Sequence, residues 1–166
     1  MLFRSIVDRA GTAGPDVAAA LGASWHECDI LDFEGVEKVV ADVVSKLGGI
    51  DACVITAGGG IGAKTISKNG PHSLDDFRKV VDLNLIGSFN INRLVAWEMS
   101  KNEPNEDDER GVIINTASIA AFEGQIGQVA YTASKAGVAG MSLTMARDLG
   151  TYGIRVNAIA PSLFET

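Results

Sequence analysis

The sequence predicts a doubly wound α/β fold, in which helices cover both faces of a parallel sheet. Short apolar runs rich in β-branched residues, typical of buried parallel strands, alternate along the chain with segments of helical periodicity. The composition is 46% hydrophobic with 19 glycines in 166 residues, as expected for a compact α/β protein with many tight turns. This length indicates one domain, residues 1–166.

Charge and composition exclude several functions. A net charge of −7 argues against nucleic acid or an anionic membrane as a partner. No apolar run reaches the roughly 18 residues of a membrane span, and the N-terminal apolar stretch is too short for a signal peptide. Cys28 and Cys53 each lie in an apolar run and predict buried free thiols. We therefore expect a cytoplasmic protein, or one of the mitochondrial matrix in a eukaryote.

The first predicted strand, Leu2–Val7, ends at Asp8. In dinucleotide-binding folds an acidic residue at the end of the second strand accepts hydrogen bonds from the adenosine ribose. Since such a residue repels a 2′-phosphate, Asp8 predicts NAD rather than NADP. A plain turn aspartate is the alternative, and Arg9 could bind a phosphate.

Only seven residues precede Asp8, whereas a βαβ unit takes at least about 30. We therefore expect the sequence to lack the first strand, the glycine-rich turn and the first helix. A structure should then show a gap or a foreign strand beside residues 2–7. The 166 residues alone are expected not to be a competent enzyme.

The next elements follow in strand and helix order. A helix is predicted at Pro15–Leu21, with proline at its start and Gly22 past its end. A strand at Trp25–Cys28 leads to Asp29, which could also cap the following turn. Apolar residues spaced three and four apart predict an amphipathic helix at Phe33–Leu47.

A buried strand at Asp51–Ala57 runs into a glycine-rich segment that imitates two phosphate-binding motifs. Gly58, Gly60 and Ala63 fit G-x-G-x-x-A, and the Lys and Thr that follow almost complete a P-loop. Both motifs require a helix to open at once. Residues Lys64–Pro71 have loop composition instead, so we reject both.

A long helix is predicted from Ser73, its N-cap, to Met99. It contains Asn84 between two leucines, and a buried amide requires partners. A satisfied core amide is the simplest interpretation of the residue alone. The charged run Glu103–Glu109 is predicted to be a solvated loop.

The stretch Gly111–Lys135 carries the chemistry. A strand at Val112–Ile114 should stop at the small polar residues that begin with Asn115, and Ser118 lies 13 residues before Tyr131. Tyr131 and Lys135 are four apart, on one face of a helix. A phenol titrates near about 10, and an ammonium within about 4–6 Å favours the phenolate, which creates a general base. Ser118 could hold a substrate oxygen.

This trio resembles the signature of the short-chain dehydrogenase/reductase family, Tyr-x-x-x-Lys with a preceding Ser. The longer run NTASIAAFEGQIGQVAYTASKAG, with IAPSLFET after it, looks like the type-2 3-hydroxyacyl-CoA dehydrogenase subfamily. The resemblance covers Asp8 to Thr166. It implies a Rossmann-type fold, Tyr131 as acid/base and substrate contact, Lys135 on the nicotinamide ribose, and Asn84 in a proton relay.

Further cofactor contacts are implied by the resemblance. Asp29 and Ile30 would grip adenine. The family has an Asn-rich turn near the adenosine of the cofactor, and this chain has Thr56, Ala57 and Gly58 there. Because the asparagines are missing, only a contact through the backbone of Ala57 and Gly58 is implied. Ser162 replaces the family's glycine after Pro161. Further implied contacts are Phe164 and Thr166.

The expected function is reversible hydride transfer between NAD and a secondary alcohol or ketone, with 3-hydroxyacyl-CoA and 3-oxoacyl-CoA as the expected pair, without a metal. The alternatives are a 3-oxoacyl-carrier-protein reductase, a hydroxysteroid dehydrogenase, or a truncated, silent domain that only associates with partners. A helix running on to about Leu149 and a strand at Ile154–Ile159 complete the predicted elements. The helix's small residues suggest a homo-oligomer, a dimer or tetramer: Ala133, Ala136, Gly137, Ala139 and Gly140.

Overall fold

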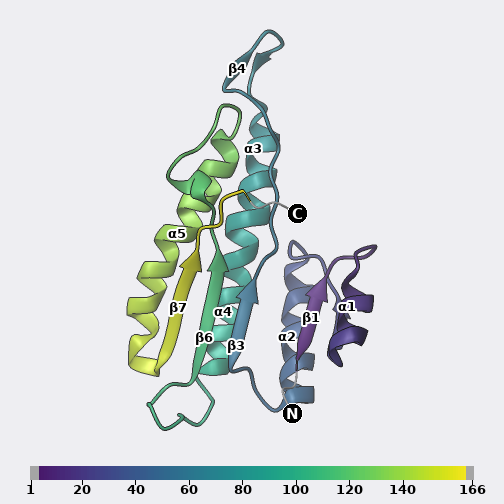
Figure 1. Cartoon of the computed structure of the whole chain (residues 1–166), viewed down its shortest axis with the longest axis vertical. Helices are drawn as coiled ribbons and strands as arrows, with labels where there is room; N and C mark the ends of the chain where they lie inside the picture. Colours follow the sequence, from purple (N-terminus) through teal and green to yellow (C-terminus); the bar gives the residue numbers. More distant parts are fainter. Residues whose placement is uncertain (1–3, 164–166) are drawn as a thin grey trace.

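The computed structural model describes residues 4–163, and its N-terminal part is a small parallel sheet with two helices (Figure 1). β1 and β2 pair in parallel, with Val7 opposite His26. The predicted strands and helices of this part are confirmed, with ends that differ by up to three residues. Leu2 and Phe3 lie outside the described residues. The elements are β1 (Ser5–Asp8), α1 (Gly14–Leu21), β2 (Ser24–Glu27) and α2 (Phe33–Leu47).

The remainder forms a second parallel sheet, β3–β6–β7, in which Ile113 of the central strand pairs with Cys53 and Val156. Two 3₁₀ turns, Ile119–Ala121 and Gly150–Tyr152, join its parts. The elements are β3 (Ala52–Ile55), β4 (Ile66–Ser67), β5 (Gly70–Pro71), α3 (Leu74–Val81), a π-helical turn (Asp82–Ile86), α4 (Gly87–Met99), β6 (Gly111–Thr116), α5 (Val129–Leu149) and β7 (Ile154–Ile159).

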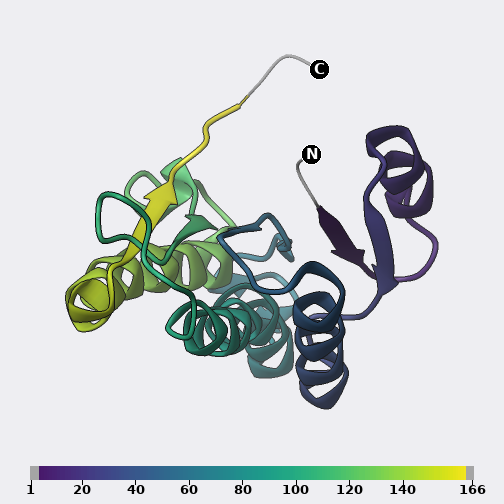
Figure 2. The ribbon, with the colours of Figure 1, turned by 90° about the horizontal axis from the view of Figure 1, so that it is seen from below.

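Helices α4 and α5 cover one face of this sheet, and the main core lies between them and the strands. In Figure 2 the helices α2, α4 and α5 lie in one layer below the strands, whereas α1 lies on the other side. Ion pairing of Arg93 with Glu37, 2.9 Å apart, joins α4 to α2. The core residues are Val95, Ala96, Met99, Ile113, Met145, Ile154 and Val156.

The two sheets are separate: within residues 4–163, no strand pairs with the free edge of β1 or with that of β3 (Figure 1). All the labelled long strands nevertheless point the same way. The gap expected beside β1 is therefore confirmed. The doubly wound, Rossmann-type α/β arrangement is confirmed as well, with parallel strands and helices on both sides.

Two predicted elements need correction. The segment Lys64–Pro71 was predicted to be a loop, but it forms the β4–β5 hairpin, with Ile66 opposite Pro71. The helix predicted from Ser73 to Met99 is interrupted by the π-helical turn. Its start is correct, since the Ser73 hydroxyl accepts a hydrogen bond from the Asp76 N–H at 3.2 Å. The glycine-rich segment opens no helix, so rejecting both phosphate-binding motifs was correct.

Across residues 4–163, no helix has the length and apolar character needed to cross a bilayer. Cys28 and Cys53 are both free thiols and partly buried. Burial raises the pKa of the Cys53 thiol to about 11, which keeps it protonated and unreactive at neutral pH.

Candidate active site

The candidate site lies at the carboxyl ends of the parallel strands, whose arrowheads point upward and end near the middle of Figure 1. There β1 ends at Asp8, β3 at Ile55, and β6 at Thr116. In open parallel sheets, ligands bind outside this edge. The fold thus brings the segment after β3 and the segment after β6 to one place.

Lys135 is the buried cation of the site. Its side chain projects from α5 on the same face as Tyr131, and its Nζ lies 5.7 Å from the centre of the Tyr131 ring. Nζ donates a hydrogen bond to the Thr116 carbonyl oxygen at 2.6 Å. The residue is only 3% exposed, and burial lowers the pKa of Lys135. An ammonium has three N–H donors. Within residues 4–163 only the Thr116 carbonyl accepts from one of them, so two donors remain for the oxygens of a ligand.

Asn84 joins this centre to the glycine-rich segment. It lies in the π-helical turn and is 0% exposed. Its Nδ2 donates to the carbonyl oxygens of Val80, at 2.8 Å, and Gly59, at 2.7 Å, while Oδ1 accepts from the Gly59 N–H at 3.0 Å. The amide is therefore fully satisfied, as the simpler interpretation of the sequence expected. Its role in a proton relay stays a prediction.

The glycines after β3 pack directly on Asn84, Lys135 and Tyr131, a feature that the sequence interpretation missed. A methyl group on Gly58 would lie 2.6 Å from Asn84 Oδ1 and 3.2 Å from Lys135 Nζ. On Gly60 it would lie 3.2 Å from Cδ2 of the Tyr131 ring. Three consecutive glycines after a predicted strand were the available signal, since glycine permits a close backbone approach.

We expect Gly58→Ala to destabilise the protein by about 1–3 kcal/mol, because the methyl group overpacks a site formed by Asn84 and Lys135. Gly62→Ala is the matched control: it lies in the same segment, without a neighbour within 4 Å and without a left-handed backbone. Urea unfolding should show Gly62→Ala within about 1 kcal/mol of the parent. Equal effects of the two substitutions would contradict the packing described here.

Ser118 lies two residues beyond Thr116 and is half-buried. Its Oγ accepts a hydrogen bond from the Ala120 N–H at 3.1 Å and caps the 3₁₀ turn Ile119–Ala121, which packs against α5. A serine hydroxyl that accepts one bond still has its proton to donate. The phenol and the ammonium thus lie together on α5, and the hydroxyl lies on a segment that packs against the same helix.

Two of the predicted cofactor contacts, Asp8 and Asp29, have exposed side chains, whereas that of Ile30 is buried. Asp8 is exposed, and its Oδ1 accepts from the Arg9 N–H at 2.8 Å. Asp29 is exposed, and its Oδ1 accepts from the Leu31 N–H at 2.8 Å, as the turn-capping alternative expected. The Ile30 side chain is buried against Gly87 of α4, which leaves its backbone for a ligand.

The other predicted cofactor contacts lie after β3 and at the C-terminal end. Thr56 and Ala57 are exposed beyond the end of β3. Phe164 and Thr166 lie outside the described residues. In residues 4–163, no three His, Cys, Asp or Glu side chains form a group that could hold a metal ion.

One prediction inside the site was wrong. The strand was expected to stop at Asn115, but β6 continues through Thr116, and Asn115 is 0% exposed. Its amide makes hydrogen bonds to Asn92 of α4 and Ser142 of α5. Polar side chains with buried partners had been interpreted as the end of a strand.

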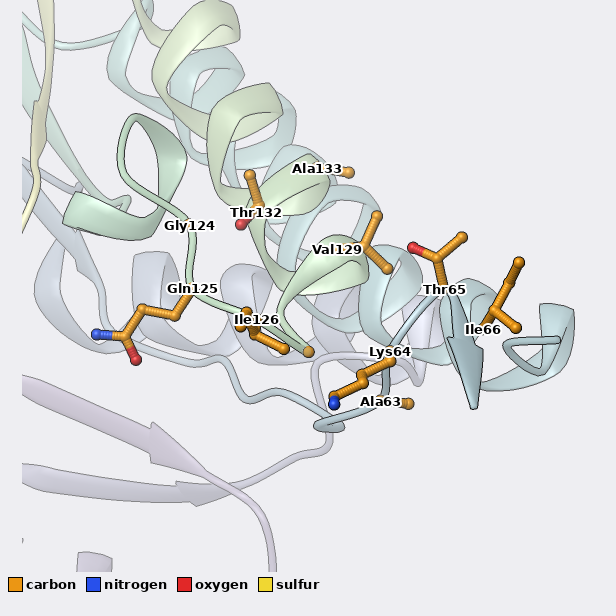
Figure 3. A pocket seen from close by; sticks show the side chains of 11 residues that line it. Ala63, Lys64, Thr65, Ile66, Gly124, Gln125, Ile126, Val129, Thr132 and Ala133 are labelled. Atoms are coloured by element: carbon orange, nitrogen blue, oxygen red, sulfur yellow. The ribbon is translucent and has the colours of Figure 1, made fainter. Parts of the chain in front are cut away.

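A cavity of about 670 Å³ is lined by neither Tyr131 nor Lys135. Its α5 wall is formed by Val129, Thr132 and Ala133, of which Val129 and Ala133 lie about half a turn around the helix from Tyr131. Figure 3 shows these side chains facing the segment Ala63–Ile66, with Gln125 and Ile126 at one side. We therefore assign this cavity no part in the chemistry of the site.

Comparison with known proteins agrees with this geometry. The family model for short chain dehydrogenase matches residues 5–166. Human 3-hydroxyacyl-CoA dehydrogenase type-2 is 47% identical over 165 residues, covering 97% of this chain and 63% of that protein. The Drosophila melanogaster protein of the same name is 46% identical, covering 97% and 65%. The chain thus spans just under two-thirds of the length of these relatives.

Solved structures give the same result. The crystal structure of 3-hydroxyacyl-CoA dehydrogenase type-2 from Mycobacterium avium superposes with a TM-score of 0.91 at 40% identity, covering 98% of this chain and 64% of that one. NAD+-bound xylitol dehydrogenase gives a TM-score of 0.86 at 30% identity, covering 99% and 62%.

Proposed function

Because this chain belongs to the short-chain dehydrogenase family, we propose that it serves the NAD-dependent interconversion of a 3-hydroxyacyl-CoA and a 3-oxoacyl-CoA. One observation carries the chemical part of the proposal. The Lys135 ammonium is buried beside the Tyr131 ring, and within residues 4–163 a single carbonyl, that of Thr116, holds it. The names of the relatives support the substrate class.

Tyr131 is the proposed acid/base. In the direction of oxidation its phenolate takes the proton of the substrate hydroxyl, and in reduction the phenol returns it. The ammonium of Lys135 favours the phenolate because an opposite charge at short range in a poorly solvated site is strongly stabilising. Ser118 donates its hydroxyl proton to the same substrate oxygen and orients it. Asn84, through the Gly59 backbone, keeps the glycine-rich segment against this centre.

The residues present fit a nicotinamide dinucleotide. Lys135 has unused donors for the nicotinamide ribose, Asp8 presents a carboxylate for the adenosine ribose, and the absence of a side chain at Gly58 permits close backbone approach. NAD, when bound, accepts or supplies the hydride at the substrate carbon. We propose Thr56, Ala57, Asp29 and the backbone of Ile30 as further contacts.

A substrate panel tests the proposal. The purified full-length protein should reduce 3-oxoacyl-CoA with NADH, followed by the absorbance of NADH, with higher kcat/KM than for 3-oxoacyl-carrier protein or a ketosteroid. A preference for the carrier-protein substrate would favour the reductase alternative. A protein that fails to bind NADH in a titration would instead be the silent, partner-associating domain.

We expect NAD to be preferred over NADP by at least about tenfold in kcat/KM, because the exposed Asp8 carboxylate repels a 2′-phosphate. Asp8→Ser should reduce this preference. Asp16→Ser, which removes an exposed carboxylate in α1, is the control and should leave it unchanged. Comparable efficiency of the parent protein with both cofactors would exclude the role of Asp8.

We also propose that the protein is a homo-oligomer that associates through α4 and α5. Their outer faces carry exposed apolar residues, including Trp97 (65% exposed) and Leu143 (57%), beside the small residues Ala136 and Gly140. Gly137, by contrast, is used within the chain, where it packs on Leu85.

Leu143→Glu should therefore dissociate the oligomer in sedimentation equilibrium, because it places a charge in an apolar contact. Leu74→Glu, at an equally exposed leucine (60%) at the start of α3, should leave the mass unchanged. A monomeric parent protein, or an oligomer that tolerates Leu143→Glu, would contradict the proposed interface.

A further inference from the structure

We propose that Asn92, Asn115 and Ser142 form a positioning chain, a buried series of hydrogen bonds that holds Lys135 in place by fixing β6 against α4 and α5. The inference rests on the proposed function, because the groups positioned are those of the proposed reaction. All three residues are buried. Each would act through the elements that carry Thr116, Ser118 and Lys135.

The chain of hydrogen bonds runs in one direction through three elements. Asn92 Nδ2 in α4 donates to Asn115 Oδ1 in β6 at 2.9 Å. Asn115 Nδ2 donates to Ser142 Oγ in α5 at 3.0 Å, and Ser142 Oγ donates to the Val138 carbonyl at 2.8 Å. Asn92 and Asn115 are 0% exposed and Ser142 is 3% exposed. Asn92 Nδ2 also donates to the Ser88 carbonyl at 2.9 Å.

The ends of this chain lie next to the candidate reaction groups. Thr116 directly follows Asn115 and supplies the carbonyl that holds Lys135 Nζ. In α5, the carbonyl of Val138 lies one turn beyond Lys135. At the other end of the chain of hydrogen bonds, Asn92 lies in α4, and α4 begins directly after the π-helical turn that contains Asn84. A shift of α5 along β6 would therefore separate Nζ from the Thr116 oxygen.

An apolar core at this position would stabilise the protein without fixing that register. Ile113, on the same face of β6 and 0% exposed, shows that an apolar residue is accommodated there. Apolar surfaces attract without direction, whereas buried amides and hydroxyls form hydrogen bonds only in particular arrangements. Within residues 4–163 Asn92 Oδ1 is buried without a partner, so the arrangement is set by the bonds that the two amide nitrogens and the Ser142 hydroxyl donate. The polar residues therefore specify one position of α5 where an apolar contact would allow several.

The test uses a matched pair at Ser142. Ser142→Thr and Ser142→Val add the same branched shape, but only the threonine keeps the hydroxyl. Trace acetylation of the intact protein, read by peptide mass spectrometry, gives the labelling rate of Lys135 relative to the exposed Lys38. Ile113→Val is the control for a simple loss of core packing, and urea unfolding gives the stability of each variant.

Several-fold faster labelling of Lys135 is expected in Ser142→Val and in Asn115→Leu, and a parental rate in Ser142→Thr and Ile113→Val. If Asn115→Leu does not fold, the Ser142 pair decides alone. Equal labelling in the valine and threonine variants, or labelling that follows the unfolding free energy across all variants, overturns the proposal. Since labelling needs neither cofactor nor substrate, its result is independent of whether the proposed reaction is found.

Discussion

Tyr131→Phe is expected to lower kcat of the active protein by about 10²–10⁴-fold, the usual contribution of a general acid/base. The substitution removes one oxygen and keeps the ring that packs against Gly60 and beside Lys135. Stability and NADH affinity should therefore change little. Steady-state kinetics, an NADH titration and urea unfolding measure the three quantities on one preparation.

Tyr152→Phe is the matched control, since this is the other tyrosine of the sequence and it is 52% exposed. Its backbone carbonyl, which accepts a hydrogen bond from Arg110, is kept by the substitution. Activity should stay at the parental level. Most of the activity surviving in Tyr131→Phe would show that another group transfers the proton.

The regular elements were predictable because their residues repeat with the period of the structure. The helix Phe33–Leu47 and the strand Ile154–Ile159 match the prediction at both ends. In the first, apolar residues fall three and four apart, Gly48 ends the helix with a left-handed backbone, and Asp32 accepts from the Gly35 N–H. Such signals are local, so the residues in and next to an element are sufficient to predict where it begins and ends.

The irregular elements depend on partners far along the chain. Asn84 faces Gly59, 25 residues away, and Asn115 faces Asn92 and Ser142, 23 and 27 residues away. Nothing in the neighbouring sequence specifies these pairs, which explains why Asn115 was taken for the end of a strand. The hairpin Ile66–Pro71 likewise has only two residues in each strand, too few for an alternating pattern.

The candidate site was predictable in its composition and only partly in its geometry. Ser118, Tyr131 and Lys135 were selected by spacing, and the structure places the last two on one face of α5. The burial of Lys135 against the Thr116 carbonyl was not foreseen. Spacing on a helix shows which residues share a face, but which other element covers that face depends on the tertiary fold.

Lys135→Met is expected to abolish turnover and to stabilise the protein. The ammonium is 3% exposed, and within residues 4–163 no carboxylate pairs with it. Replacing a buried, poorly compensated charge by an apolar side chain of similar length typically gains about 1 kcal/mol or more. Without the cation, kcat should fall by about 10²-fold or more, and NADH affinity should fall because ribose contacts are lost.

The pH dependence gives this prediction its sharpest test. Burial lowers the pKa of Lys135 in the folded state below the ordinary lysine value of 10.5. As pH rises from that lowered pKa to 10.5, the folded protein has released a proton that the unfolded chain still binds, so the free energy of unfolding rises. The excess stability of Lys135→Met over the parent should therefore be largest near neutral pH and should shrink toward pH 10.5. Lys38→Met, at an exposed lysine of α2, should show no such convergence. A Lys135→Met protein that is less stable than the parent at neutral pH would mean that the ammonium supports the fold, and the burial of an unpaired cation would then need no functional explanation.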